Sequence, residues 1–257
     1  MRTEVTPALR LSSLSIVFPA HNEVDNLEPL VAEASHVAPR LANRHEIIVV
    51  DDGSTDGTGE LADELSHDYS GVRVVRNWPN RGYGGALKAG FAAATGEWVF
   101  FTDGDRQFRL DELPDFVAAS RHADLVIGYR IRRSDPPHRL LNAWLYKRFI
   151  RALFGLKVRD IDCAYKLIRR SVLNVASLES EGALISAELL IKATRMGCRI
   201  VELGVHHYPR TAGCQSGASL KVILRMFREV RALHGRIRSF EGRVPVEAAD
   251  FDAEKVA

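Results

Sequence analysis

Residues 98–108, WVFFTDGDRQF, join a run of aromatic and β-branched residues directly to a pair of acids. The first five residues have the composition of a buried strand. Asp103 and Asp105 follow at once with only Gly104 between them, and two carboxylates this close repel each other where water is scarce. A divalent cation would remove that repulsion, so the stretch predicts a strand that ends at a ligand site.

Magnesium or manganese is the cation that we expect there. Both prefer oxygen ligands, and magnesium usually retains phosphate oxygens of a substrate in its shell. The amide of Gln107 adds an oxygen to those of Asp103 and Asp105. The alternative is that the two acids only form a turn or cap the following helix.

Strand and helix patterns alternate outward from this stretch. Apolar runs predict strands at 14–18, 46–50, 72–75, 98–102 and 124–128, with helices between them at 24–41, 58–65, 85–94 and 111–120. Strands that are apolar throughout fit a parallel sheet covered on both faces, and the repeated spacing predicts a doubly wound, mostly parallel α/β fold. Further helices are expected at 139–154, 186–196 and 217–238, and a further strand at 198–205.

The composition is that of a folded globular protein. The chain has 257 residues, 46% hydrophobic and 26% charged, which suits one large α/β domain. A net charge of +2 predicts no nucleic-acid partner. Three widely spaced cysteines indicate a reducing compartment. The N-terminus lacks the apolar core of a signal peptide, and no apolar run reaches the ~18 residues of a membrane span.

Polar residues follow the ends of the predicted strands. They occupy Pro19–Glu23, Asp51–Ser54, Asn80–Gly82, Asp103–Gln107 and Gly128–Arg130. Ligands of an open parallel sheet bind beyond the carboxyl ends of its strands. The sequence therefore predicts one acid-lined site at this edge.

Residues 52–63, DGSTDGTGELAD, come close to a calcium-binding EF-hand loop. However, a predicted strand precedes them, and Asp63 stands in place of the bidentate Glu. The alternative is a turn with a helix N-cap supplied by Thr55 or Asp56, which leaves Asp52 for another role.

Four segments in this order carry a family resemblance: SIVFPAHNE (15–23), IIVVDDGSTDGT (47–58), NRGYGGALKAG (80–90) and FFTDGDRQF (100–108). They resemble the family 2 inverting glycosyltransferases of the GT-A fold, most closely the polyprenyl-phosphate sugar synthases of the dolichol-phosphate mannose synthase type. The implied organisation is an N-terminal tail at 1–13, a Rossmann-like GT-A domain at 14–217, a basic amphipathic helix at 218–243 and a flexible tail at 244–257.

The resemblance implies a site for a nucleotide-sugar donor. The positions that match it are Pro19, Ala20, Glu23, Asp52, Lys88, Asp103, Gly104 and Gln107. Asp103, Asp105 and Gln107 stand where the family binds its Mg²⁺ or Mn²⁺. The family's usual D-A-D-L-Q reads D-G-D-R-Q here, with Arg106 in place of an apolar residue, and His21 replaces a common Tyr.

The implied reaction moves a hexose from a UDP- or GDP-linked sugar to a polyprenyl phosphate, with inversion. A phosphate monoester has a second pKa of about 6, so the acceptor is already anionic at pH 7 and needs no strong base. We expect Arg130, Arg139 and Arg210 to bind its phosphate, because the planar guanidinium matches phosphate oxygens. The expected catalytic residues are Asp105, Arg130 and Glu188.

An alcohol acceptor would change the role of the acids. It would need a general base, and Glu188 or Asp162 would serve. The alternative for Glu188 is an ordinary exposed helix residue. Two rival functions stay open: transfer to a sugar or other hydroxyl, and nucleotide-sugar binding or nucleotidyl transfer, which Arg106 inside the metal motif favours.

A lipid acceptor requires contact with a membrane. In the helix expected at 218–243, an apolar stripe is flanked by bases; the stripe consists of Leu220, Ile223, Leu224, Phe227, Val230, Leu233 and Ile237. Such a helix can lie at a membrane surface or bind a membrane partner protein. The expected location is therefore cytoplasmic, peripheral at the inner face of the cell membrane. The alternative is that the stripe packs on the catalytic domain.

Overall fold

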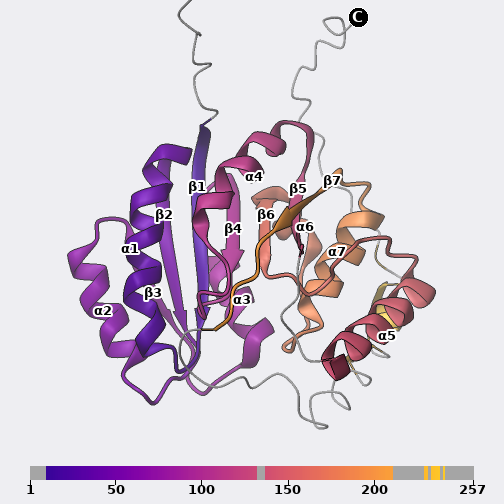
Figure 1. The fold of residues 1–257 in the computed structure, drawn as a ribbon, viewed down its shortest axis with the longest axis horizontal. Helices are drawn as coiled ribbons and strands as arrows, with labels where there is room; N and C mark the ends of the chain where they lie inside the picture. The colour runs from indigo at the N-terminus through magenta and orange to yellow at the C-terminus, as the bar shows by residue number, and fades with distance from the viewer. Residues whose placement is uncertain (1–9, 132–136, 211–228, 231–232, 238–239, 241–257) are drawn as a thin grey trace, which may run out of the picture.

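The computed structural model describes residues 10–131, 137–210, 229–230, 233–237 and 240, with 137–143 described only as helical backbone. Among these residues, a single sheet runs through the molecule (Figure 1). Its strands are β1 (Leu11–Ala20), β2 (Ala42–Asp51), β3 (Val72–Arg76), β4 (Trp98–Thr102), β5 (Leu125–Arg130), β6 (Tyr165–Arg169) and β7 (Ile200–Val205), in the order β3-β2-β1-β4-β6-β5-β7.

The sheet is parallel except at β6, which runs antiparallel to both β4 and β5. All five residues of β4 are buried, as are the last seven of β1, because helices cover both faces. Ala20 pairs with Asp51, and Val17 pairs with Phe101, so β1, β2 and β4 end close together. The doubly wound, mostly parallel fold predicted from the sequence is confirmed.

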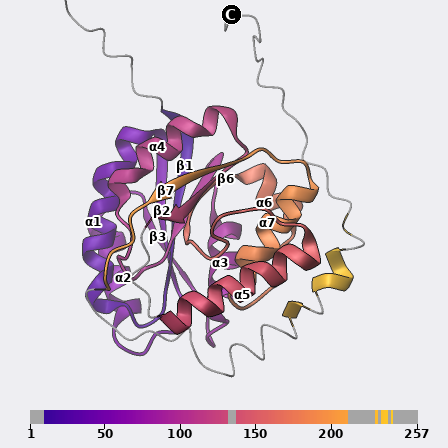
Figure 2. The ribbon, with the colours of Figure 1, turned by 45° about the vertical axis from the view of Figure 1, so that its right-hand side comes forward.

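The helices lie in two layers. They are α1 (Val24–Leu41), α2 (Thr58–Asp68), α3 (Gly82–Ala93), α4 (Leu113–Ala119), α5 (Pro137–Phe154), α6 (Arg170–Ala176) and α7 (Ile185–Arg195), with short 3₁₀ turns at Leu110–Glu112 and Ser120–His122. Figure 2 shows α1, α2 and α4 on one side of the sheet and α3, α6 and α7 on the other. Helix α5 lies at the margin of the molecule, beyond α7 (Figure 1).

Strand β6 and helix α6 were not predicted. The run YKLIR of β6 has Lys166 as its second residue and Arg169 as its last, which hides the apolar pattern of a central strand. Lys166 is fully buried, and its ammonium donates hydrogen bonds to the carbonyl oxygens of Ile161 and Cys163. Burial lowers the pKa of this amine. A charged residue that finds carbonyl partners can thus occupy a strand that its chemistry argues against.

The helix expected at 218–243 lies mostly outside the described residues. Those described, 229–230 and 233–237, are helical. Val230, Leu233 and Ile237 of the predicted stripe are at most 3% exposed and belong to the hydrophobic core. For these three residues the alternative holds, because they pack on the catalytic domain. In the described part of the chain, no helix combines the length and apolar character needed to cross a bilayer.

Candidate active site

A cleft of about 850 Å³ opens at the carboxyl ends of β1, β2 and β4. This volume lies in the usual range for small-molecule sites, about 300–1,000 Å³. Nine residues predicted from the sequence to bind donor, metal or acceptor line it: Pro19, Ala20, Glu23, Asp52, Asp103, Gly104, Asp105, Gln107 and Arg210. The structure thus brings together segments as distant in the chain as those of Pro19 and Arg210; what each residue binds remains a prediction.

The two acids that follow β4 dominate the electrostatics of the cleft. Burial and the charge of Asp105 raise the pKa of Asp103 to about 7, although a hydrogen bond with Tyr83 opposes the rise. Burial also raises the pKa of Asp105, against the backbone N–H of Gln107 and the charge of Arg210. Oδ1 of Asp103 is buried and has no hydrogen-bond partner within the described structure. The described protein groups therefore leave one buried carboxylate oxygen of the pair unsatisfied.

A buried carboxylate oxygen without a partner, beside a second carboxylate, is a donor set that suits Mg²⁺ or Mn²⁺. Among the described residues, no group of three or more His, Cys, Asp or Glu side chains is placed to hold a metal ion. The chain itself offers the carboxylates of Asp103 and Asp105 and the amide of Gln107, so substrate or water must complete a shell. These residues fit the metal expected from the sequence.

Gly104 lets the acidic turn approach β1. A Cβ atom at this position would lie 3.0 Å from the carbonyl oxygen of Pro19, which is tighter than an ordinary contact. The next residue but one, Arg106, has a φ of 57°, in the left-handed region that side chains seldom adopt. The turn therefore follows a tight path that holds both carboxylates at the end of β4.

The segment after β7 closes one side of the cleft. The Gln107 side chain donates to the Tyr208 carbonyl oxygen at 3.0 Å, and the Tyr208 backbone N–H donates to the Gln107 carbonyl at 2.9 Å. This pairing brings Arg210 into the cleft, where it donates to Glu23 and lies 3.7 Å from Oδ2 of Asp105. A guanidinium thus stands beside the acids, where a donor or acceptor phosphate would need it.

Asp52 forms the opposite wall. Its side chain is 3% exposed, and Oδ1 accepts hydrogen bonds from Asn77 Nδ2 at 2.8 Å and from the Arg81 backbone N–H at 3.0 Å. The Asp52 backbone N–H donates to the carbonyl oxygen of Ala20 at 2.9 Å. These bonds tie the ends of β1 and β2 to the start of α3, so the carboxylate is held rigidly at the cleft.

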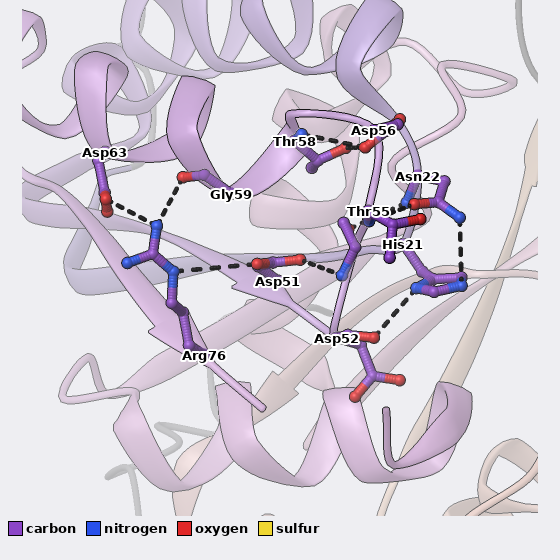
Figure 3. A network of polar contacts seen from close by, with 11 residues as sticks. His21, Asn22, Asp51, Asp52, Thr55, Asp56, Thr58, Gly59, Asp63 and Arg76 are labelled. Atoms are coloured by element: carbon purple, nitrogen blue, oxygen red, sulfur yellow. Dashed lines mark hydrogen bonds and ion pairs between the residues drawn. The ribbon is translucent and has the colours of Figure 1, made fainter. Parts of the chain in front are cut away.

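Figure 3 shows the polar network that supports the loop after β2. Arg76 bridges Asp63, at 2.6 Å, and Asp51, at 3.9 Å. Asp56 accepts the Thr58 backbone N–H at 3.0 Å, where α2 begins. The acids of the EF-hand-like stretch therefore have partners inside the protein, which favours the turn over a calcium loop.

Arg130, Lys88 and Glu188 were predicted for the site, but their described contacts lie outside the cleft lining. Arg130 forms a two-pronged ion pair with Asp160, at 2.7 and 2.8 Å, which raises the pKa of the guanidinium although burial opposes this. Lys88 donates to the Glu179 carbonyl oxygen at 2.9 Å. Neither residue is among the described cleft-lining side chains. Arg139 belongs to α5, but its side chain lies outside the description.

Glu188 is also absent from the described cleft lining. It is fully buried rather than exposed, and its carboxylate forms an ion pair with Lys192 at 2.7 Å. It also accepts the backbone N–H groups of Glu179 and Ser180. Burial opposes ionisation, but these bonds outweigh it and hold the pKa of Glu188 below its ordinary value. Its role as a base remains a prediction; of the two acids proposed for that role, Asp162 is the one that lines the cleft.

Sequence reasoning missed Tyr83. This residue lines the cleft, and its hydroxyl shares a hydrogen bond with Asp103. Burial and the nearby carboxylates raise its pKa well above the ordinary value, so the phenol stays protonated and donates. Its place in the motif NRGYGGALKAG, which begins four residues after β3 ends, was the available signal.

Comparison with known proteins identifies the family. The model of Glycosyl transferase family 2 matches residues 15–175, which include most of β1, all of β2 to β6 and the Asp103–Asp105 pair. The chain belongs to this family. As a family 2 member it is a glycosyltransferase, which confirms the class of enzyme predicted from the sequence.

Two relatives of this glycosyltransferase match over most of its length. The polyprenol monophosphomannose synthase of Mycolicibacterium smegmatis is 31% identical over 243 residues, which cover 89% of this chain and 90% of the relative. The dodecaprenyl-phosphate galacturonate synthase of Rhizobium johnstonii is 31% identical over 224 residues, which cover 84% of this chain and 64% of that relative.

A solved structure confirms the GT-A fold of the glycosyltransferase. The crystal structure of glucosyl-3-phosphoglycerate synthase from Mycobacterium tuberculosis in complex with Mn²⁺, UDP and glucosyl-3-phosphoglycerate superposes with a TM-score of 0.66 at 24% identity. The match covers 88% of this chain and 80% of that one.

Proposed function

We propose that this glycosyltransferase moves a hexose from a nucleotide sugar to a polyprenyl phosphate, with inversion at the anomeric carbon and with the help of a divalent metal. The observation that carries the proposal is the single cleft surface formed by Asp52, the Asp103–Asp105 pair and Arg210. The two relatives, named as polyprenyl-phosphate synthases of different sugars, support the acceptor class and leave the sugar open.

The residues proposed to bind the donor lie at the ends of the strands. Asp52 is fixed by Asn77 and Arg81 and can accept hydrogen bonds from a ribose or base. Asp103, Asp105 and Gln107 would hold a divalent cation, which when bound would neutralise the charge that develops on the leaving nucleoside diphosphate. Tyr83 keeps Asp103 in place through its hydroxyl. The solved Mn²⁺ and UDP complex of a protein with this fold supports a metal of this class.

The acceptor half needs positive charge rather than a base. An attacking phosphate is already ionised at pH 7, so the protein has to hold it against an anionic donor. Arg210 stands in the cleft and can turn from Glu23 and Asp105 toward a phosphate. Arg130 is not among the residues that line the cleft, but its charge favours the ionised form of Asp103.

Replacing Arg210 with Ala should raise the KM for the acceptor by about tenfold or more, because a charged hydrogen bond contributes about 1.5–3 kcal/mol. The KM for the donor at saturating Mn²⁺ should change much less. Initial rates measured while each substrate is varied separate the two. Arg199→Ala, which removes an exposed arginine at the start of β7, is the matched control. Equal changes in both KM values would count against an acceptor role.

The function itself is tested with a panel of UDP- and GDP-linked hexoses. Each is incubated with Mn²⁺ or Mg²⁺ and undecaprenyl phosphate, and the lipid phase is examined for radiolabelled product. A labelled lipid that is lost on mild acid supports a sugar phosphodiester. Label that enters only added sugars or other hydroxyl compounds would support the hydroxyl alternative, with Asp162 as base. Binding without either product would indicate a nucleotide-sugar binder.

A further inference from the structure

Helix α5 carries large apolar side chains that are exposed in the described structure. Tyr146, Ile150 and Phe154, spaced four residues apart, belong to the face that packs on the core. Outside that face, Trp144 and Leu145 are each 50% exposed. Phe149 and Leu153 follow at 37%.

The exposed apolar side chains are concentrated on α5. Six large apolar side chains are exposed in the described part of the chain, and four of them lie on this one helix. At 100° per residue, Leu145, Phe149 and Leu153 form one stripe beside the packed face. Contiguous exposed apolar surface of this kind marks a site of interaction with a protein or a membrane.

The border of the stripe is basic. By the same helical geometry, Arg148 and Arg151 lie on the side of the stripe away from the packed face, together with Trp144, and the Arg148 guanidinium sits 5.1 Å from the centre of the Trp144 ring. Over its whole length, 137–154, the helix contains four Lys or Arg residues and no Asp or Glu. An apolar stripe beside a face whose charged residues are all basic is the pattern of a helix that lies in the headgroup region of a bilayer.

The position of α5 suits such contact. Strand β5 runs parallel to β7 and in the same direction as β4, so the chain leaves β5 at the edge of the sheet that holds the cleft. Helix α5 follows, and it lies at the outside of the molecule in the lower part of Figure 1. A membrane in contact with α5 would therefore lie close to the cleft.

We propose that the outward face of α5, formed by Trp144, Leu145, Phe149 and Leu153 with the bases beside them, binds the surface of an anionic lipid bilayer. The proposal deepens the proposed function, because a polyprenyl phosphate is presented by such a surface. It also transfers to α5 the membrane contact that the sequence suggested for 218–243, where Val230, Leu233 and Ile237 are buried.

Charge decides between a bilayer and a second copy of the chain. In a two-fold dimer through this face, Arg148 and Arg151 would meet their own copies, and like charges at an interface disfavour association. An anionic lipid surface instead attracts each of these bases. The long side chains can keep their charges among the headgroups while their stems cover the apolar stripe.

The three tryptophans allow a direct test. Trp98 is 3% exposed and serves as a silent background, whereas Trp78, after β3, is 81% exposed. In the Trp78→Phe protein, mixing with vesicles of phosphatidylglycerol should shift the Trp144 emission to the blue and raise its intensity. In the matched Trp144→Phe protein, Trp78 should report no such change. Vesicles of phosphatidylcholine alone should give a much weaker response.

Co-sedimentation with the same vesicles gives the size of the effect. The pair Leu145→Ser and Leu153→Ser should lower the partition coefficient about tenfold or more, since half-exposed leucines lose apolar burial of about 25 cal/mol per Å². The pair Arg148→Gln and Arg151→Gln should lower it on anionic vesicles only.

Three outcomes would overturn the proposal: no response to anionic vesicles, equal binding by the serine variant, or a blue shift that depends on protein concentration without lipid, which would indicate self-association. These readouts need no donor and no transfer. A chain that binds vesicles but makes no lipid product would refute the proposed function alone. A chain that glycosylates a short polyprenyl phosphate in detergent but ignores vesicles would refute the α5 surface alone.

Discussion

Asp103→Asn is expected to lower kcat/KM for sugar transfer by about 10³-fold or more. Removing a group that stabilises the charge of a transition state typically costs about 10²–10³ in rate, and here the change also removes a proposed metal ligand. Oδ1 of Asp103 has no partner in the described structure, so no protein contact replaces the lost charge. Initial rates with Mn²⁺ and the donor found by the panel measure the loss.

The same substitution should stabilise the protein in the absence of metal. The pKa of Asp103 is about 7 in the folded chain, whereas an Asp carboxyl in the unfolded chain has its ordinary value of 3.8. Between these two pH values the native state therefore binds more protons than the unfolded state. Stability therefore falls as the pH rises through this window, and at pH 8 the cost of the buried charge is fully present. We expect Asp103→Asn to raise the melting temperature at pH 8 by about 2–4 °C.

The pH dependence supplies the control for that measurement. The gain should shrink as the pH is lowered from about 7 toward 4, where wild-type Asp103 is itself protonated. Asp68→Asn makes the same chemical change at an exposed position and should show no such trend. Adding Mn²⁺ with the nucleoside diphosphate should stabilise the wild-type protein more than the variant. A variant that is active, or that is destabilised at pH 8, would contradict the role assigned to Asp103.

Lys192→Met is expected to destabilise the protein by about 3–5 kcal/mol, the usual cost of leaving one member of a buried ion pair uncompensated. The Lys192 and Glu188 side chains are 3% and 0% exposed and lie 2.7 Å apart within α7. Lys192 also donates to the Ser177 carbonyl oxygen at 2.9 Å. Denaturant unfolding at pH 7 measures the loss, and Lys157→Met, at an exposed lysine, is the matched control.

Lys192→Met should also disturb the structure of the cleft. Glu188 holds the backbone of Glu179 and Ser180, and the next carbonyl, that of Glu181, accepts the Gly84 N–H at 2.8 Å. A Cβ at Gly84 would come within 2.4 Å of the Ser180 carbonyl oxygen, so this segment packs tightly on the turn of α3 that carries Tyr83. Lys192→Met should therefore lower kcat in the fraction that remains folded.

The double variant Glu188→Gln with Lys192→Met tests whether the uncompensated charge of Glu188 causes the destabilisation. Because it leaves no buried charge, it should recover part of the stability lost in Lys192→Met. The hydrogen bonds to Glu188 hold its pKa below 4.5, so the stability from this ionised group is present above that pH and is lost as the pH falls through the folded pKa. A single variant no less stable than Lys157→Met would show that the pair is dispensable.

The sequence predicted those parts of the fold that local pattern determines. Strand 98–102 and helix 24–41 have the predicted bounds, since each is a clean apolar or amphipathic run with polar residues at its end. Strand β6 was missed because Lys166 interrupts its apolar run. Its burial depends on the carbonyl groups of Ile161 and Cys163, which are placed by tertiary structure and leave no local signal.

In the site, too, some residues could be predicted from local pattern and others depend on tertiary structure. Residues that follow parallel strands, such as Asp52 and Asp103, converge because the carboxyl ends of the parallel strands lie at one edge of the sheet. Arg130 is the last residue of β5, but the partner that fixes the direction of its side chain, Asp160, lies 30 residues further along the chain. Glu188 resembled a surface residue because a helix sequence does not reveal which face another segment covers.

The central claim is that the Asp103–Asp105 edge binds a divalent cation together with the diphosphate of a sugar nucleotide. Titration calorimetry with UDP and with GDP, each with and without Mn²⁺, tests it most directly. We predict that one nucleotide binds at least about tenfold more tightly with Mn²⁺ present, and that Asp103→Asn removes this gain. Failure of both nucleotides to bind, or an affinity that neither Mn²⁺ nor Asp103→Asn alters, would contradict the claim.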